Sequence, residues 1–259
     1  MPIFNNNRED LYYEIEGQGP ALVLIHSLGT CSELWRDAIA RWKGRYTVLA
    51  MDCRGHGKST ANGGVALEMI ASDLRALMQS LKLKSADVIG ISMGGPIAAW
   101  LYAQAPELVG RMVLADTFTH IPEAGLRLEG LERKLDAMPM ADFGAEYAAQ
   151  TLLPATAPER HKALSGWIAG MSTQAYRQTV RSIFAQDIKG ALTDIKVPVL
   201  VMVGDQDQRA PVAMAEQVAM LVSGAQMNIV PDAGHLANMD NPVAFYGAID
   251  DFFAQKTVD

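Results

Sequence analysis

The chain has 259 residues, of which 49% are hydrophobic and 20% are charged. A chain of this length and composition can bury roughly three quarters of the surface that it exposes when unfolded, which predicts a well-packed globular protein. Its 29 acidic residues against 22 Lys and Arg give a net charge of −7, and the basic residues do not cluster. Nucleic acid and anionic membrane are therefore excluded as expected partners, because both require basic patches.

The two cysteines, Cys31 and Cys53, form no CxxC pair, and no His/Cys spacing typical of a metal site occurs. We therefore expect two reduced thiols, no metal and no cofactor. The first residues, MPIFNNNRED, contain no apolar signal segment, and no run of about 18 apolar residues follows. The expected location is the cytoplasm.

Short apolar segments alternate with helical patterns along most of the chain. Most of the later segments are apolar at consecutive positions, which is typical of parallel strands that are covered on both faces. Between them, residues 67–81 and 243–253 carry apolar side chains at helical spacing. The polar stretch at 5–10 predicts an antiparallel hairpin at the start of the sheet. The predicted strands are Leu11–Ile15, Ala21–Ile25, Tyr46–Met51, Ala86–Ile91, Arg111–Ala115, Val197–Val203 and Gln226–Val230.

Residues 118–193 interrupt this alternation. They contain helical patterns broken by prolines but no convincing strand. A helical insertion between two strands indicates a lid over one edge of the sheet and not a second domain. We therefore expect a single domain, with a core formed by residues 1–117 and 194–259 and a helical cap at 118–193.

The residues GISMGG, Gly90–Gly95, place one serine between glycines, after a predicted strand and before a predicted helix. They match G-x-S-x-G, the nucleophile elbow, in the strand–turn–helix context that this motif requires. In so sharp a turn Ser92 adopts a strained backbone conformation, and a Cβ at Gly90 or Gly94 would collide with its surroundings. A phosphate-binding turn is the alternative, but neither G-x-G-x-x-G nor GK[ST] is present. Gly95 lies outside the motif, and we expect it to serve helix packing.

A serine hydroxyl is a weak nucleophile that needs a general base oriented by a carboxylate. Of the five histidines, His235 lies after the last predicted strand and before the last predicted helix. It therefore lies at the same edge of the sheet as Ser92 and is the predicted base. Of the others, two precede the serine in the chain and two fall in the cap.

The carboxylate is expected at the end of the strand that precedes the histidine, where Asp205 and Asp207 are both candidates. We favour Asp207, because Asp205 directly follows the strand and is better placed to cap the turn backbone. Asp116, at the end of an earlier strand, is a rarer alternative. With Asp207, the chain order Ser, Asp, His is that of one particular fold.

Four further segments occur in a recognisable order. They are HSLG at 26–29, DCRGHGKS at 52–59, GDQDQRAP at 204–211, and a Gly-His pair at 234–235 followed by Pro242. With the elbow, they resemble the oxyanion loop, the D-x-R-G-x-G-x-S segment, the acid segment and the histidine segment of α/β-hydrolases. The resemblance covers nearly the whole chain except the cap. It implies an α/β-hydrolase fold, with a mostly parallel eight-stranded sheet flanked by helices and a helical lid at about 118–193, and it places Asp207 in the acid position.

Within this family, HSLGT with Trp35, DCRGHG, GISMGG and GHLANMDNP are similar to segments of 3-oxoadipate enol-lactonases. This implies a serine hydrolase that cleaves a small lactone or carboxylic ester through an acyl-enzyme in the breakdown of aromatic compounds. The chain departs from the family in carrying Ser27 where glycine is usual, a change also seen in that subgroup. None of these segments lies in the cap, and the lid selects the substrate in such folds.

The resemblance also implies a role for each site residue. Ser92 attacks an acyl carbon, His235 takes and returns the proton, and Asp207 orients His235. The backbone N–H groups of Leu28 and Met93 form the oxyanion hole, the second at a helix start whose dipole adds to the stabilisation.

Ser27, Trp35 and Trp167 are candidates for the substrate pocket, although a turn role for the serine and core roles for the tryptophans are the alternatives. If the substrate carries carboxylates, a cap arginine is expected to face the pocket. The candidates are Arg127, Arg133, Arg160, Arg177 and Arg181.

Other activities of the same fold remain open: carboxylesterase, acyl-homoserine lactonase, cofactor-free haloperoxidase and carbon–carbon bond hydrolase. Epoxide hydrolases and dehalogenases carry Asp at the elbow, so Ser92 argues against both. A receptor for small lactones that retains the same residues is the alternative outside enzymes. The expected partner is a small ester or lactone, and the expected state is a monomer or homodimer.

Overall fold

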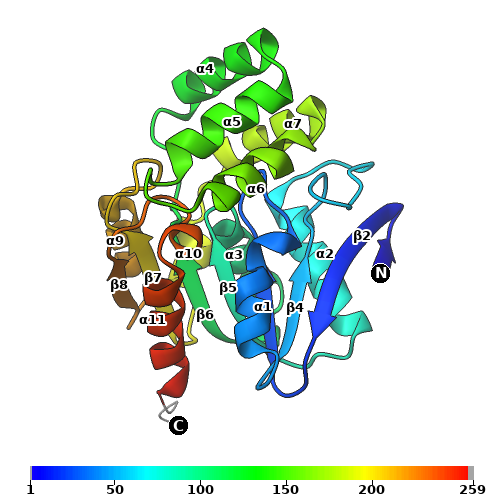
Figure 1. The fold of residues 1–259 in the computed structure, drawn as a ribbon. Coiled ribbons are helices and arrows are strands. Elements are labelled where there is room, and N and C mark those ends of the chain that lie inside the picture. Colours follow the sequence, from blue (N-terminus) through cyan, green and yellow to red (C-terminus); the bar gives the residue numbers. More distant parts are fainter. Residues whose placement is uncertain (1, 256–259) are drawn as a thin grey trace.

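A computed structural model describes residues 2–255, and an eight-stranded sheet forms the centre of the molecule (Figure 1). The strand order is β1-β2-β4-β3-β5-β6-β7-β8. β2 runs antiparallel to both of its neighbours, and all pairs from β4 to β8 are parallel. The strands are β1 (Ile3–Asn6), β2 (Glu9–Glu16), β3 (Ala21–Ile25), β4 (Thr47–Met51), β5 (Ala86–Ile91), β6 (Val109–Ala115), β7 (Val199–Gly204) and β8 (Gln226–Val230). The predicted mostly parallel eight-stranded sheet is confirmed.

The first strand forms the predicted hairpin with β2. The turn between them consists of Asn7 and Arg8, whose φ angles are +48° and +75°. Two consecutive residues of positive φ form the tight turn that matches the twist of paired strands, and asparagine tolerates this conformation well.

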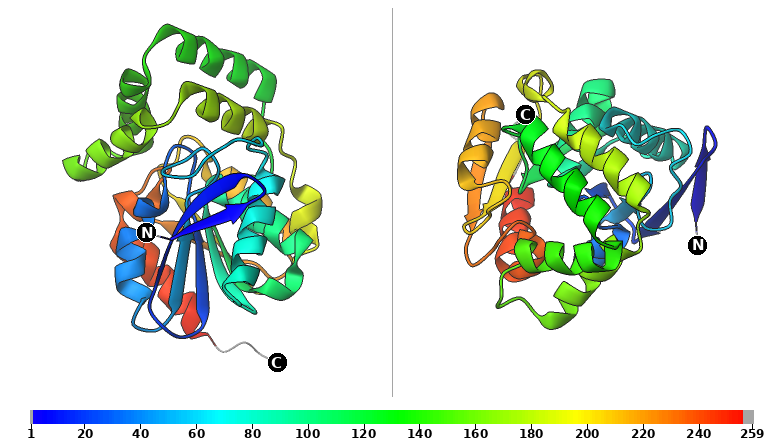
Figure 2. Two further views of the ribbon diagram at one scale, coloured as in Figure 1. Left: turned by 90° about the vertical axis from the view of Figure 1, so that its right-hand side faces the viewer. Right: turned by 90° about the horizontal axis from the view of Figure 1, so that it is seen from above.

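The central strands are apolar throughout because both of their faces are covered. In β3, Ala21, Val23 and Ile25 face one hydrophobic core, whereas Leu22 and Leu24 face the other. Helices α2, α3, α8 and α9 pack on the first face, and α1 and α11 pack on the second (Figures 1 and 2).

These and the remaining helices have the following bounds. The α-helices are α1 (Arg36–Trp42), α2 (Leu67–Ser80), α3 (Gly94–Gln104), α4 (Ala124–Ala137), α5 (Met140–Thr151), α6 (Pro158–Ala169), α7 (Thr173–Phe184), α8 (Lys189–Thr193), α9 (Val212–Leu221), α10 (Ala237–Asp240) and α11 (Pro242–Ala254), and the 3₁₀ turns are η1 (Ser32–Trp35) and η2 (Pro106–Leu108).

Helices α4–α7 lie above the carboxyl edge of the sheet, between β6 and β7 in the chain (Figures 1 and 2). A single antiparallel bridge between His120 and Asp187 joins the segments that enter and leave this cap. The following helix, α8, packs against α3 and α9 and belongs to the core layer. The cap therefore covers the edge at which the loops after β3, β5, β7 and β8 meet.

Candidate active site

Ser92 lies in the turn between β5 and α3, with a φ of +54°. A positive φ is uncommon for a residue with a side chain, and it persists only where the surroundings enforce it. The backbone N–H of Ser92 donates to Ala115 of β6, and its carbonyl accepts the Thr117 hydroxyl at 2.8 Å. The elbow is therefore held from the end of the neighbouring strand.

The glycines of the elbow remove atoms that would collide with backbone. A Cβ on Gly90 would lie 2.2 Å from the carbonyl oxygen of Gly94, and a Cβ on Gly94 would lie 2.3 Å from that of Ile25. Gly95, in α3, allows the close packing of this helix against the residue that holds the elbow. A Cβ there would lie 2.2 Å from Oγ1 of Thr117, the side chain that holds the carbonyl of Ser92.

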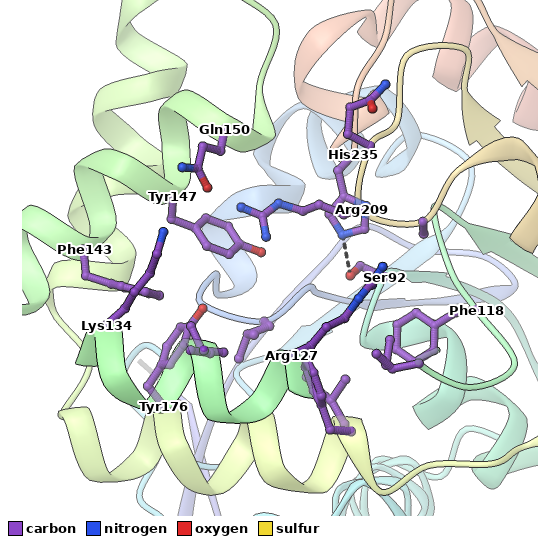
Figure 3. A pocket seen from close by; sticks show the side chains of 18 of the residues that line it. Ser92, Phe118, Arg127, Lys134, Phe143, Tyr147, Gln150, Tyr176, Arg209 and His235 are labelled. Carbon is purple, nitrogen blue, oxygen red and sulfur yellow. Dashed lines mark hydrogen bonds between the residues drawn. The ribbon is translucent and has the colours of Figure 1, made fainter. Parts of the chain in front are cut away.

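Three buried side chains form a chain of hydrogen bonds at this edge of the sheet (Figure 3 shows its first link). Ser92 Oγ lies 2.9 Å from His235 Nε2, and His235 Nδ1 lies 2.8 Å from Asp207 Oδ2. An ionised carboxylate can only accept a hydrogen bond, so His235 Nδ1 carries the proton and donates a hydrogen bond to Asp207. His235 Nε2 is then free to accept from the hydroxyl of Ser92. This is the arrangement in which a histidine can take a proton from a serine.

Asp207 is fixed on both oxygens. Its Oδ1 accepts the backbone N–H groups of Arg209 and Ala210, at 2.7 and 2.9 Å. Burial raises the pKa of its carboxyl, but the neighbouring His235 and these N–H donors outweigh burial and leave the pKa below its usual value. Asp205 instead accepts the N–H of Ala233 at 3.1 Å and holds the turn backbone.

Asp116 lies directly behind this pair. Its two oxygens accept the N–H groups of Gly204 and Ala237, at 2.9 and 3.1 Å. It therefore ties the start of the Asp207 loop to the helix after His235. Burial, and then the charge of Asp207, raise the pKa of Asp116 well above its usual value.

Two backbone N–H groups adjoin the serine. Leu28 lines the cavity above Ser92, and Met93 immediately follows Ser92 at the start of α3. Neither N–H donates to another residue within 2–255. Unpaired donors next to a nucleophile can bind an oxygen that becomes negatively charged in the reaction.

A cavity of about 480 Å³ opens from Ser92 and His235 towards the cap, a size that suits a small-molecule ligand. Figure 3 shows side chains from the cap and from the Asp207 loop around it. Its aromatic wall consists of Phe118, Phe143, Tyr147, Tyr176 and Phe184.

The charged residues of the cavity are Arg127, Lys134, Glu146 and Arg209. Lys134 and Glu146 form an ion pair with each other. Neither Arg127 nor Arg209 has a carboxylate partner within residues 2–255. The guanidinium of Arg209 lies 4.0 Å from the ring centroid of Tyr147, and its Nε donates to Thr151 Oγ1 at 2.9 Å.

The candidate pocket residues from the sequence do not line this cavity. Ser27 and Trp35 are fully buried, and Trp35 packs in the core with α1. Trp167 lies on α6, and its ring N–H points to Glu33 at 3.4 Å. The residue types that suggested a pocket role did not indicate which way these side chains point.

Of the five cap arginines considered, Arg127 lines the cavity. Arg160, Arg177 and Arg181 form ion pairs with acidic side chains. Arg209, in the Asp207 loop, was not anticipated. In the sequence, Arg209 is distinguished only by its place two residues after Asp207, and this place does not determine the direction of its side chain.

Cys31 is a buried free cysteine that does not line the cavity. Burial, followed by the charge of Asp52, raises the pKa of its thiol to about 12, so the thiol keeps its proton at neutral pH. Within residues 2–255, no group of three or more His, Cys, Asp or Glu side chains is arranged to hold a metal ion. The same part of the chain contains no helix of the length and apolar character needed to span a bilayer.

The model of the alpha/beta hydrolase fold family matches residues 20–242. The chain therefore belongs to this family, as its sheet and elbow indicate. It is similar to 3-oxoadipate enol-lactonase 2 of Acinetobacter baylyi, with 31% identity over 245 residues that cover 93% of this chain and 91% of that protein.

Solved structures show the same relationship. A hydrolase from Pseudomonas aeruginosa PA01 superposes with a TM-score of 0.90 at 26% identity, covering 98% of each chain. The enol-lactonase from Burkholderia xenovorans LB400 superposes with a TM-score of 0.81 at 29% identity, covering 98% of this chain and 100% of that one.

Proposed function

We propose that this protein is a serine hydrolase that cleaves a small lactone or carboxylic ester through an acyl-enzyme. The observation that carries the proposal is the chain of hydrogen bonds from Ser92 through His235 to Asp207, at the base of a cavity of small-molecule size. A structural cluster would have no need of a strained serine that opens into a cavity.

The reaction begins when Ser92 Oγ attacks the acyl carbon and His235 Nε2 takes the hydroxyl proton. The carbonyl oxygen becomes an oxyanion, to which the N–H groups of Leu28 and Met93 donate. Collapse breaks the ester bond, and Nε2 returns the proton to the leaving oxygen. Water then attacks the acyl-enzyme by the same route, with His235 as base.

Asp207 keeps His235 in the required tautomer and stabilises the imidazolium. Because the pKa of Asp207 lies below its usual value, the carboxylate stays ionised at neutral pH. The imidazolium that forms in each half-reaction thus always faces a negative charge.

For the substrate, we propose an acyl compound that carries a carboxylate, as in an enol-lactone with an acidic side arm. Two arginines without carboxylate partners, Arg127 and Arg209, line a cavity in a chain of net charge −7. Guanidinium groups bind carboxylates in a bidentate manner. The similarity to enol-lactonases supports the lactone.

The test is the Ser92→Ala variant assayed with p-nitrophenyl acetate. We expect hydrolysis to fall to the background rate while the thermal unfolding temperature stays within a few degrees of the wild type, since only one hydroxyl is removed. Mass spectrometry of the wild type with a slowly hydrolysed ester should show the acyl group on Ser92. Full activity in the variant would refute the nucleophile assignment.

A further inference from the structure

The carbonyl oxygen of Ser27 accepts three hydrogen bonds. His26 Nδ1 lies 2.8 Å from it, the Thr30 hydroxyl donates at 2.9 Å, and the Thr30 backbone N–H donates at 3.2 Å. The oxygen and the N–H of Leu28 belong to the same peptide group, and in a planar trans peptide they point in opposite directions. Fixing this oxygen therefore also fixes the direction of the Leu28 N–H.

The hydrogen bonds determine the tautomer of His26. Its Nε2 lies 2.9 Å from the backbone nitrogen of Cys53, which can only donate, so Nε2 is the acceptor. A neutral imidazole has one donor and one acceptor, so Nδ1 carries the proton and donates to Ser27. His26 thus joins the loop after β3 to the loop after β4, and each ring nitrogen has a defined partner.

His26 is suited to a permanent role and not to proton transfer. Its side chain is fully buried and does not line the cavity. Burial lowers its pKa to about 4, although the bond to Ser27 opposes this shift. The ring is therefore neutral at physiological pH and keeps one donor and one acceptor for its two partners.

We propose that His26, together with Thr30, is a positioning residue of the oxyanion hole: it holds the Ser27–Leu28 peptide so that the Leu28 N–H points at the developing oxyanion. The inference rests on the proposed function, because it presupposes an acyl-transfer reaction at Ser92. It assigns a role to two buried side chains that do not touch the substrate.

Two substitutions at one position separate positioning from general packing. The nitrogen of an Asn side chain lies two bonds from Cβ, as Nδ1 does, so His26→Asn keeps a donor for Ser27. The polar atoms of a Gln side chain lie three bonds from Cβ, as Nε2 does, so His26→Gln keeps the partner of Cys53 and loses that donor. We expect His26→Gln to lower kcat about 10- to 100-fold with little change in KM, less than the loss of an oxyanion donor itself. His26→Asn should stay within a few-fold of the wild type.

Thr30 provides a second test in case the His26 variants fold poorly. Thr30→Val removes the hydroxyl donor without changing the size of the side chain, and we expect kcat to fall several-fold. Thr30→Ser restores a hydroxyl and should restore kcat.

His56→Gln is the matched control for the His26 variants. His56 is equally buried and its ring centroid lies 5.0 Å from that of His26, but its ring bonds to the carbonyl of Arg54 and not to Ser27.

The infrared spectrum of the acyl-enzyme gives a readout that loss of stability does not change. A well-aligned N–H polarises the acyl carbonyl and lowers its stretching frequency. We expect this band to move to higher frequency in His26→Gln and Thr30→Val, and to stay in place in His26→Asn, Thr30→Ser and His56→Gln.

Three outcomes would overturn the inference: wild-type turnover in His26→Gln together with Thr30→Val, equal losses in both His26 variants, or an unchanged carbonyl band. In each case the wild type would still acylate Ser92, so the proposed function would stand. Absence of an acyl-enzyme in the wild type would overturn both proposals.

Discussion

Asp205 and Asp207 follow β7 within three residues of each other, yet their carboxylates make different hydrogen bonds. Asp207 is buried against His235, whereas Asp205 is exposed and accepts the N–H of Ala233. Only the first can hold the imidazole in the tautomer that accepts a proton from Ser92. The carboxylate preferred from its place in the sequence is therefore the one in contact with the histidine.

Replacing each of the two aspartates by asparagine tests which one supports catalysis. We expect Asp207→Asn to lower kcat by about 10⁴-fold, the loss that serine hydrolases show when the carboxylate becomes an amide and the histidine takes the wrong tautomer. Asp205→Asn should cost less than about 10-fold, because an amide oxygen can still accept from Ala233. Steady-state kinetics on one ester would decide, and comparable losses would show that Asp207 has no special role.

Among the elements, α4 is attached to the rest of the molecule by a few apolar contacts, from Leu128, Leu131 and Leu135, and by ion pairs. Of its fourteen residues only Leu135 is buried. Glu132 pairs with Arg177 and Arg181 of α7, and Lys134 pairs with Glu146 of α5. Such partly exposed ion pairs each contribute little to stability. The same helix carries Arg127 to the cavity.

The arginines of α4 make the substrate class testable. Arg127 lines the cavity, whereas Arg133 lies on the same helix and does not line it, although both side chains are exposed. We expect Arg127→Gln to lower kcat/KM for mono-p-nitrophenyl glutarate roughly 5- to 10-fold, the effect of about 1 kcal/mol lost with one partly exposed ion pair. The neutral ester p-nitrophenyl butyrate should be unaffected.

Arg133→Gln is the control and should change neither substrate. If the glutarate and butyrate esters lost activity equally in Arg127→Gln, the residue would act through the shape of the cap and not through charge.

At the scale of the whole molecule, two buried histidines link stability to pH. Burial lowers the pKa of His26 to about 4 and that of His56 to about 3, and the neighbouring His26 contributes to the second shift. In the unfolded chain both titrate near 6.5. The unfolded state therefore binds more protons than the folded state throughout the interval between these values.

We expect the free energy of unfolding to be constant above pH 7 and to fall as the pH drops from about 6.5 to about 4. His26 alone accounts for roughly 3 kcal/mol over this range, at about 1.4 kcal/mol per pKa unit. The contribution of Asp207 has the same sign, but because its pKa in the folded state lies below the usual value of 3.8, that contribution is lost only at lower pH. Urea unfolding at pH 7 and pH 5 measures how steeply the free energy of unfolding falls with pH. This pH dependence should be weaker in His26→Asn. A flat profile would show that the histidines are not held neutral.

Local features of the sequence sufficed where a residue pattern strongly favours one local structure. GISMGG predicted the elbow because glycines at 90 and 94 leave room for a strained serine between a strand and a helix. Apolar runs such as ALVLI predicted parallel strands because they have the length of a strand and a sheet covered on both faces buries consecutive residues. The chain order of Ser92, Asp207 and His235 followed from the strands that they succeed.

What the sequence by itself determined was thus the sheet, the elbow and the loops that carry the three polar side chains. Only the tertiary structure decided that Trp35 packs in the core, that Gly95 makes room for Thr117, that Arg209 reaches the cavity and that His26 holds the peptide before Leu28. The physical reason is that these facts concern the direction of a side chain towards residues distant in the chain. A strand or a motif fixes the backbone locally, but the partner of a buried side chain is known only when the loops come together.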